Sequence, residues 1–140
     1  MIDELKKKIS STKGVDFGPF GEGISDEWIT KAEERLHFIF PDTYKWWLKN
    51  YMGGEINGEE IFSIYGLDFD RVVGGDIVYI NELNREEGFS NSDQLVICEG
   101  EDGMFYFQKQ ESLTNELVVF RDGEYYASDF IEFLIKRIDG

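Results

Sequence analysis

The hydrophobic residues of the first fifty positions recur every three or four residues, which is the spacing of amphipathic helices. Ile2, Leu5 and Ile9 predict a short helix at the N-terminus. A second helix is predicted after Ser25, a favoured N-cap residue, and its apolar positions are Trp28, Ile29, Ala32 and Leu36. A third is predicted from Pro41 to the turn at Gly53-Gly54, with a stripe formed by Tyr44, Trp47, Leu48 and Tyr51. The glycine-rich stretch 14–23 predicts a loop that turns its two phenylalanines inward, or a flexible connector.

From residue 56 onward the pattern changes to short runs of β-branched and aromatic residues. These runs are 61–65, 95–98, 105–107 and 117–120. Asp102-Gly103 and Asp122-Gly123 lie between such runs and predict type I′ hairpin turns. The pattern therefore predicts an antiparallel β-sheet of about four to six strands.

Two further helices are predicted in the second half of the chain. Helical spacing indicates one helix over about 76–86, carried by Val73, Ile77, Ile80 and Asn84. Ser128-Asp129 is expected to cap a closing helix whose apolar face includes Phe130, Phe133, Leu134 and Ile138. This order of elements is typical of an α+β fold with helices packed against the sheet. At 140 residues we expect one domain, 1–140.

Composition sets the cellular setting that we expect. The single cysteine, Cys98, lies in an apolar run, so we predict a buried structural thiol and neither a disulfide framework nor a cysteine-based zinc site. No apolar run approaches the roughly 18 residues of a membrane span, and the N-terminal residues 1–10 lack the apolar segment of a signal peptide. We therefore expect a cytoplasmic protein with no membrane partner.

The formal net charge of −15 is distributed unevenly along the chain. Residues 57–140 hold nineteen acidic and six basic residues, a net charge of −13, while the first 56 residues are nearly balanced. Such a charge repels phosphate backbones, so we expect no nucleic-acid partner. The same charge attracts a basic protein, although it also suits a protein whose acidity only maintains solubility.

The residue types that catalysis usually requires are scarce in this chain. The only histidine, His37, is placed at the end of the second helix, where a capping or surface role is favoured over that of a general base. Asp68-Phe69-Asp70 is similar to the start of a calcium loop, but Val73 and Tyr79 stand where such a loop needs Gly and Glu. We therefore predict no catalytic residue, no metal site and no cofactor, and we expect that the protein is not an enzyme. A small hydrolase using paired carboxylates or a divalent metal is the least favoured alternative.

The predicted pair of helices carries a family resemblance. Residues 24–56 resemble the signature of the SUKH superfamily, which includes fungal regulators of cell-wall assembly, at Ile29, Ala32, Glu33, Leu36, Pro41, Tyr44, Lys45, Trp47, Leu48, Gly53 and Gly54. His37 stands where the family usually has glycine, and Phe40 is the apolar residue before the proline. The later segments 95–99, 102–103, 105–107 and 128–134 resemble the family's strands, turn and closing helix, so the resemblance covers about 25–135.

The resemblance implies a function in binding. Many bacterial members of the superfamily are immunity proteins that neutralise secreted polymorphic toxins, often nucleases, whereas fungal members are regulatory interaction modules. An immunity protein is the leading hypothesis, because an acidic protein complements the basic cleft of a nuclease. A regulatory module for an endogenous partner is the alternative. The sequence leaves the oligomeric state open.

We predict that the partner is a protein, a cognate basic toxin domain, and that it contacts the acidic second part of the chain. The carboxylates expected at this interface are Asp68, Asp70, Asp76, Glu99, Glu101 and Asp102. Trp46, which lies off the stripe of its helix, and Tyr79 are the expected aromatic anchors, because binding hot spots favour Trp and Tyr. Alternatively, Trp46 forms a second packing face of its helix.

Overall fold

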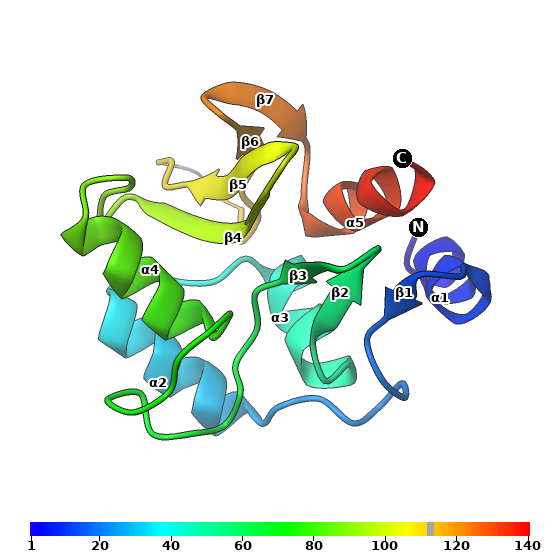
Figure 1. The fold of residues 1–140 in the computed structure, drawn as a ribbon, viewed down its shortest axis with the longest axis horizontal. Coiled ribbons are helices and arrows are strands. Elements are labelled where there is room, and N and C mark those ends of the chain that lie inside the picture. Colours follow the sequence, from blue (N-terminus) through cyan, green and yellow to red (C-terminus); the bar gives the residue numbers. More distant parts are fainter. Residues whose placement is uncertain (112–113) are drawn as a thin grey trace.

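The computed structural model describes residues 1–111 and 114–140 (Figure 1). Its elements follow in the order α1 (Ile2–Ser11), β1 (Val15–Asp16), α2 (Asp26–Leu36), α3 (Asp42–Asn50), β2 (Gly54–Ile56), β3 (Glu59–Ile61), α4 (Ile77–Glu86), β4 (Gln94–Gly100), β5 (Gly103–Gln108), β6 (Val119–Arg121), β7 (Glu124–Ala127) and α5 (Phe130–Asp139). The predicted α+β class is confirmed. No helix in the described part of the chain has the length and apolar character needed to cross a membrane.

The strands are divided between two antiparallel sheets, in the orders β1-β2-β3 and β4-β5-β6-β7. Figure 1 shows the smaller sheet between α3 and α1, and the larger sheet along the upper edge of the molecule. Helices α2 and α4 pack against each other, and α1 packs against α5. The α1–α5 contact includes an ion pair of 2.8 Å between Lys8 and Asp139, so it joins the two ends of the chain.

Two hairpins have the backbone of a type I′ turn. Asp122-Gly123, as predicted, has φ angles of 49° and 89°, and Asn57-Gly58 between β2 and β3 has 51° and 83°. The type I′ prediction at Asp102-Gly103 is wrong, because Glu101 and Asp102 form the loop and neither has a positive φ. Gly100 pairs with Gly103 in the register that buries alternate residues of β5. The loop therefore lies one residue earlier in the sequence than predicted.

The predicted strand 61–65 is a strand only at its first residue. β3 ends at Ile61, and the buried segment that follows is held by individual contacts. The Phe62 amide donates to the Ile97 carbonyl of β4 at 2.8 Å, and the Tyr44 hydroxyl donates to the Phe62 carbonyl at 2.6 Å. Because these contacts satisfy the backbone of Phe62, the segment stays buried without a strand ladder.

The helix pair forms as the sequence predicts. The Ser25 hydroxyl accepts a hydrogen bond from the Trp28 amide at 3.4 Å, and Pro41 is the N-cap of α3. His37 ends α2 in the left-handed conformation, with a φ of 52°, which explains why glycine suits this position. The predicted stripe of α3 is buried, and the Tyr44 and Phe130 rings lie 4.9 Å apart between α3 and α5.

The loop 14–23 and the two later helices agree with prediction in part. Phe17 is buried, but Phe20 is half exposed. Helix α4 begins after Asp76, and its buried face contains Ile77, Val78, Asn81 and Asn84, whereas Val73 is exposed ahead of the helix. Helix α5 is capped as expected, because the Asp129 carboxylate accepts from the Glu132 amide at 2.8 Å.

Candidate protein-binding surface

Three of the residues predicted from the sequence lie on one surface, formed by loop 66–74 and α4. Asp70 and Tyr79 line a hollow of about 300 Å³, together with Glu86 of α4. Asp68 is exposed in the same loop, and its carboxylate accepts a hydrogen bond from the Asp70 amide at 3.0 Å. We call this surface, made of loop 66–74 and the outer side of α4, the α4 face.

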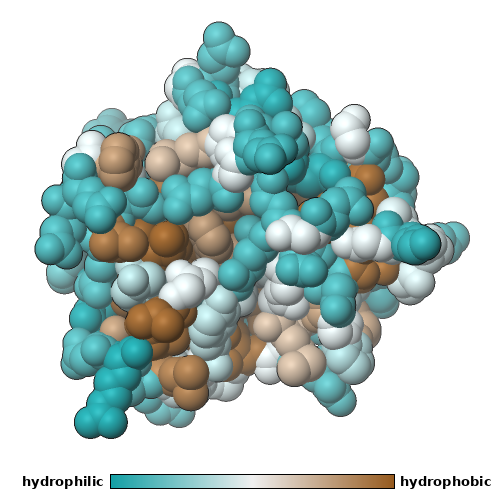
Figure 2. All heavy atoms as spheres, viewed as in Figure 1, coloured by the Kyte–Doolittle hydropathy of each residue, from teal (hydrophilic) through white to brown (hydrophobic). Residues whose placement is uncertain are grey.

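The α4 face also exposes apolar side chains. Leu67 is 57% exposed and Val73 is 63% exposed. Figure 2 shows hydrophobic residues at the surface in this part of the molecule. The Phe69 ring packs edge to face on Trp28 of α2 at 5.6 Å, which anchors the loop beside these exposed residues. A surface that combines exposed apolar and acidic side chains is suited to contact with a protein.

An arginine bridges two of the carboxylates on the α4 face. Arg35 of α2 donates to Asp70 and to Glu82, with an N–O distance of 2.9 Å in each ion pair. These hydrogen bonds, first that with Glu82 and then that with Asp70, raise the pKa of the guanidinium above its usual range. Asp70 therefore has an internal partner, whereas no cation lies within 4.0 Å of Asp68 or Glu86 among the described residues.

Asp76 is placed differently from the prediction, because its side chain is fully buried. One carboxylate oxygen accepts from the Val78 and Tyr79 amides at 2.9 and 3.3 Å, and the other accepts from the Tyr65 amide at 3.0 Å. Burial raises the pKa of this carboxyl, and the three amide donors oppose the rise. Asp76 is the N-cap of α4 and has no exposed surface for a partner, so it leaves the set of predicted interface residues.

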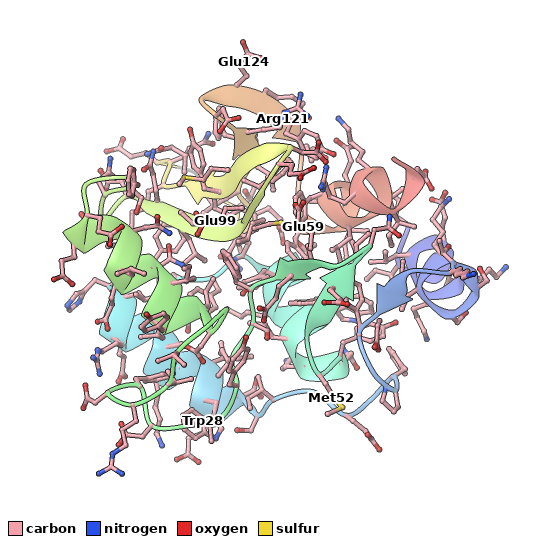
Figure 3. All side chains as sticks on the ribbon, in the orientation of Figure 1. Trp28, Met52, Glu59, Glu99, Arg121 and Glu124 are labelled. Carbon is pink, nitrogen blue, oxygen red and sulfur yellow. The ribbon has the colours of Figure 1, made fainter. Side chains whose placement is uncertain are left out.

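Glu99, Glu101 and Asp102 lie apart from the α4 face, at the end of β4 and in the following turn. Asp102 is bound by Arg137 of α5 at 3.0 Å, and the same guanidinium binds Glu59 of β3 at 3.0 Å. Figure 3 shows Glu59 and Glu99 near the junction of the two sheets, and the buried Asn84 of α4 donates to the Glu99 carboxylate at 3.5 Å. The structure therefore divides the predicted carboxylates between two surfaces.

Trp46, the other predicted anchor, is not part of either surface. Its side chain is half buried on α3, with ring centroids 6.5 Å from Phe20 and 6.0 Å from Tyr51. Of its two predicted roles, the second packing face agrees with this position.

A row of carboxylates on the smaller sheet was not predicted from the sequence. Asp16 of β1 is directly opposite Glu55 of β2, and Glu55 is directly opposite Glu60 of β3. The Asn57-Gly58 turn was the available signal, because a two-residue hairpin at this position pairs Glu55 with Glu60. The pairing of Asp16 depends on a contact between distant segments, which no local signal indicates.

The acidic side chains of the described residues are not arranged to bind a single metal ion. No group of three or more His, Cys, Asp or Glu side chains within residues 1–111 and 114–140 is arranged to hold a metal ion. Cys98 is buried, and its thiol donates to Glu59 at 3.0 Å. Burial first, and then this carboxylate, raise the pKa of the thiol, which keeps it protonated and poorly nucleophilic.

A comparison with protein families gives a match over most of the chain. The family model described as SUKH_6: SMI1-KNR4 cell-wall matches residues 26–134, from the start of α2 into α5. The match includes the helix pair, both hairpins of the larger sheet and the α4 face, and it leaves out α1 and β1.

Proposed function

The chain belongs to the SUKH_6, SMI1-KNR4 cell-wall family, and from this membership we propose that it is an immunity protein that binds and neutralises a toxin domain with a basic, nuclease-type cleft. It acts by binding and not by catalysis. Its place of action is the cytoplasm, where a nuclease would otherwise attack the cell that makes it. The observation that carries the proposal is the surplus of carboxylates that have no internal cation.

The basic residues of the second part of the chain are largely engaged inside the protein. Arg85 donates to the backbone carbonyls of Leu36 and Gln94, and Lys136 donates to the Tyr126 carbonyl at 2.7 Å. Neither cation forms an ion pair with a carboxylate among the described residues, whereas Arg137 pairs with Glu59 and Asp102. The negative charge of residues 57–140 remains at the surface, where it can attract a basic protein over a distance of about 10 Å.

Electrostatic attraction of this kind chiefly accelerates association. Complementary charges raise association rates to about 10⁸–10⁹ M⁻¹s⁻¹ at low salt, and rapid capture is what an antidote requires. The α4 face supports such an encounter, because Asp68 and Glu86 are exposed beside the apolar Leu67 and Val73. Charge would bring the partner in, and burial of the apolar side chains would then hold it.

Growth rescue tests the proposed function. The chain is co-expressed with the toxin domain encoded beside it, and we expect restored growth and a stable complex. Rescue that fails with every neighbouring toxin candidate, together with capture of an endogenous partner, would replace the proposal with the regulatory alternative.

Paired variants locate the charge effect on the purified complex. Asp68→Asn/Glu86→Gln removes two free carboxylates from the α4 face, and we expect an association rate about three- to tenfold lower at low salt. Glu4→Gln/Glu124→Gln removes the same charge from α1 and β7 and is the control; Figure 3 shows Glu124 at the opposite end of the molecule from loop 66–74. Equal effects of the two double variants would show that only the total charge matters.

A further inference from the structure

The carboxylate row of the smaller sheet, formed by Asp16, Glu55 and Glu60, lacks the cation that accompanies other converging carboxylates in this protein. Arg35 bridges Asp70 and Glu82, and Arg137 bridges Glu59 and Asp102. In contrast, no basic side chain within the described part of the chain lies within 4.0 Å of the row. Like charges directly opposite each other on adjacent strands are unfavourable, so the row has a cost within the free protein.

The row borders a hollow of about 530 Å³ whose wall includes a serine hydroxyl. Asp16, Glu55 and Glu60 line it together with Ser63, which is only 2% exposed. The Ser63 hydroxyl makes no hydrogen bond with residues 1–111 or 114–140, and it is not among their fully enclosed side-chain atoms that lack a partner, so it faces the open hollow. Its Oγ lies against Gly53, in space that a Cβ at this position would occupy. Because Gly53 has no side chain, the Ser63 hydroxyl can occupy this space at the wall of the hollow.

The edge of the same hollow is apolar. Met52 is 61% exposed, and Figure 3 shows it projecting from the periphery of the molecule. Tyr65 lies on the other side, where its hydroxyl donates to Glu60 and accepts from the Gly75 amide. Burial, followed by the bond to Glu60, raises the pKa of Tyr65 to about 12, so the phenol stays neutral and leaves the charge of the carboxylate in place. Side chains of this kind can contact the aliphatic stem of a long basic residue.

The shape of the row favours an extended cation over a metal ion. Adjacent strands are about 4.8 Å apart, so the three carboxylates extend over about 10 Å. Among the described residues, these three carboxylates do not belong to any group that is arranged to hold a metal ion. A guanidinium is planar, has five N–H donors and binds two carboxylates at once, as Arg35 and Arg137 do here.

We propose that the hollow beside Asp16, Glu55 and Glu60 binds an arginine side chain from a basic segment of the partner protein. The guanidinium donates to the carboxylate row and to the Ser63 hydroxyl, while its stem lies against Met52. The inference rests on the proposed function only for the origin of this arginine; the site itself follows from its charge and the free hydroxyl. It places a second contact of the partner on a surface distinct from the α4 face.

Amide NMR with N-acetyl-arginine-amide as the probe tests the site. We expect saturable shifts centred on Gly53, Gly54, Ser63 and Gly75, and weaker ones with the corresponding lysine compound. Asp16→Asn/Glu55→Gln should lower the affinity about tenfold without loss of the fold, because both side chains are exposed and two charge pairs are lost. Ser63→Ala should lower it about threefold, since one hydrogen bond is removed.

A charge-matched control separates the site from general attraction. Glu4→Gln/Glu124→Gln removes two exposed carboxylates from α1 and β7 and should leave arginine binding unchanged. Equal losses in the two double variants, or shifts spread evenly over all acidic surfaces, would overturn the proposal. Sedimentation that shows a dimer dissociated by Asp16→Asn/Glu55→Gln would also overturn it, because a second copy would then occupy the face. Growth rescue without arginine binding refutes the site alone, whereas arginine binding without rescue refutes only the immunity function.

Discussion

Glu33 shows how one charged residue of the family signature stabilises the fold. Its carboxylate is nearly buried and accepts a hydrogen bond from the Phe40 amide at 2.7 Å, and Lys45 lies 3.4 Å away. The side chain therefore ties the end of α2 to the start of α3 and satisfies a backbone amide of the connection. The Ala-Glu pair of the resemblance has a structural explanation that requires no ligand.

Replacing Glu33 tests this role at the residue scale. Glu33→Ala leaves the Phe40 amide without its partner, and we expect a loss of about 1–3 kcal/mol in the free energy of unfolding, measured with urea. Glu34→Ala, at the exposed neighbouring position, should change this free energy by less than about 0.5 kcal/mol. A comparable loss in both variants would refute the role of the buried hydrogen bond, because alanine itself favours the helix.

Cys98 gives a prediction on pH. Because burial and Glu59 raise its pKa in the folded protein, the folded thiol keeps its proton above the ordinary value of 9.0 while the unfolded thiol loses it. The unfolded state is therefore favoured as pH rises above about 9. The stability of the native sequence relative to Cys98→Ala should fall by up to about 1.4 kcal/mol per pH unit in this range. Urea unfolding at several pH values measures it, and a difference that stays constant with pH would refute the assignment.

Asp76 illustrates why some residues were misplaced at this scale. A carboxylate directly before a helix is an N-cap signal as well as a surface charge, and the prediction gave weight only to the charge. Burial decides between the two, and burial depends on the segment 63–65, which contacts Asp76 from outside its own helix.

The helix α4 protects the outer edge of the larger sheet. Asn81, fully buried in α4, accepts from the Val96 amide at 2.7 Å and donates to the Val96 carbonyl at 2.9 Å. The Ile97 carbonyl of the same strand accepts from Phe62. The edge of β4 is therefore covered by a side chain and an irregular segment, which prevents it from pairing with another chain.

Removal of this contact should weaken the attachment of the whole element. Asn81→Ala leaves two buried backbone groups of Val96 unsatisfied, and we expect a loss of about 2–4 kcal/mol in the free energy of unfolding. Asn50→Ala is the control, because Asn50 donates only to the Trp46 carbonyl within its own helix. Amide exchange should accelerate at Val96 in the first variant. Unchanged exchange there would show that α4 is held mainly by its apolar contacts.

At the scale of elements, local signals were sufficient where partners are close in sequence. The caps at Ser25 and Asp129 and the Asp122-Gly123 turn appear as predicted. The segment 61–65 does not, because after Ile61 its backbone makes isolated contacts, such as those of Phe62 with Ile97 of β4 and Tyr44 of α3, and forms no strand ladder. Hydrophobic runs indicate burial but leave the type of backbone to these distant contacts.

The charge of the whole molecule has a consequence for stability. The eight ion pairs among the described residues neutralise few of the 29 acidic side chains. The remaining carboxylates are therefore expected to repel one another within the folded protein. Raising NaCl from about 0.02 to 0.5 M shortens the screening length to a few ångströms and should increase the free energy of unfolding by about 1 kcal/mol. Urea unfolding at each salt concentration measures this change. A decrease with salt would mean that the ion pairs outweigh the repulsion.

The amino-acid sequence was enough to predict the α+β class, the helix pair and the acidic character, because these follow from periodicity, caps and composition within short segments. The family followed from the resemblance carried by the helix pair. The surfaces required the folded chain. Asp68, Asp70 and Tyr79 lie together because α4 packs on α2, and Asp76 is buried against the segment 63–65. The carboxylate row exists only because β1 pairs with β2, which is about forty residues away. Contacts between distant segments set which charges converge, and no local pattern encodes them.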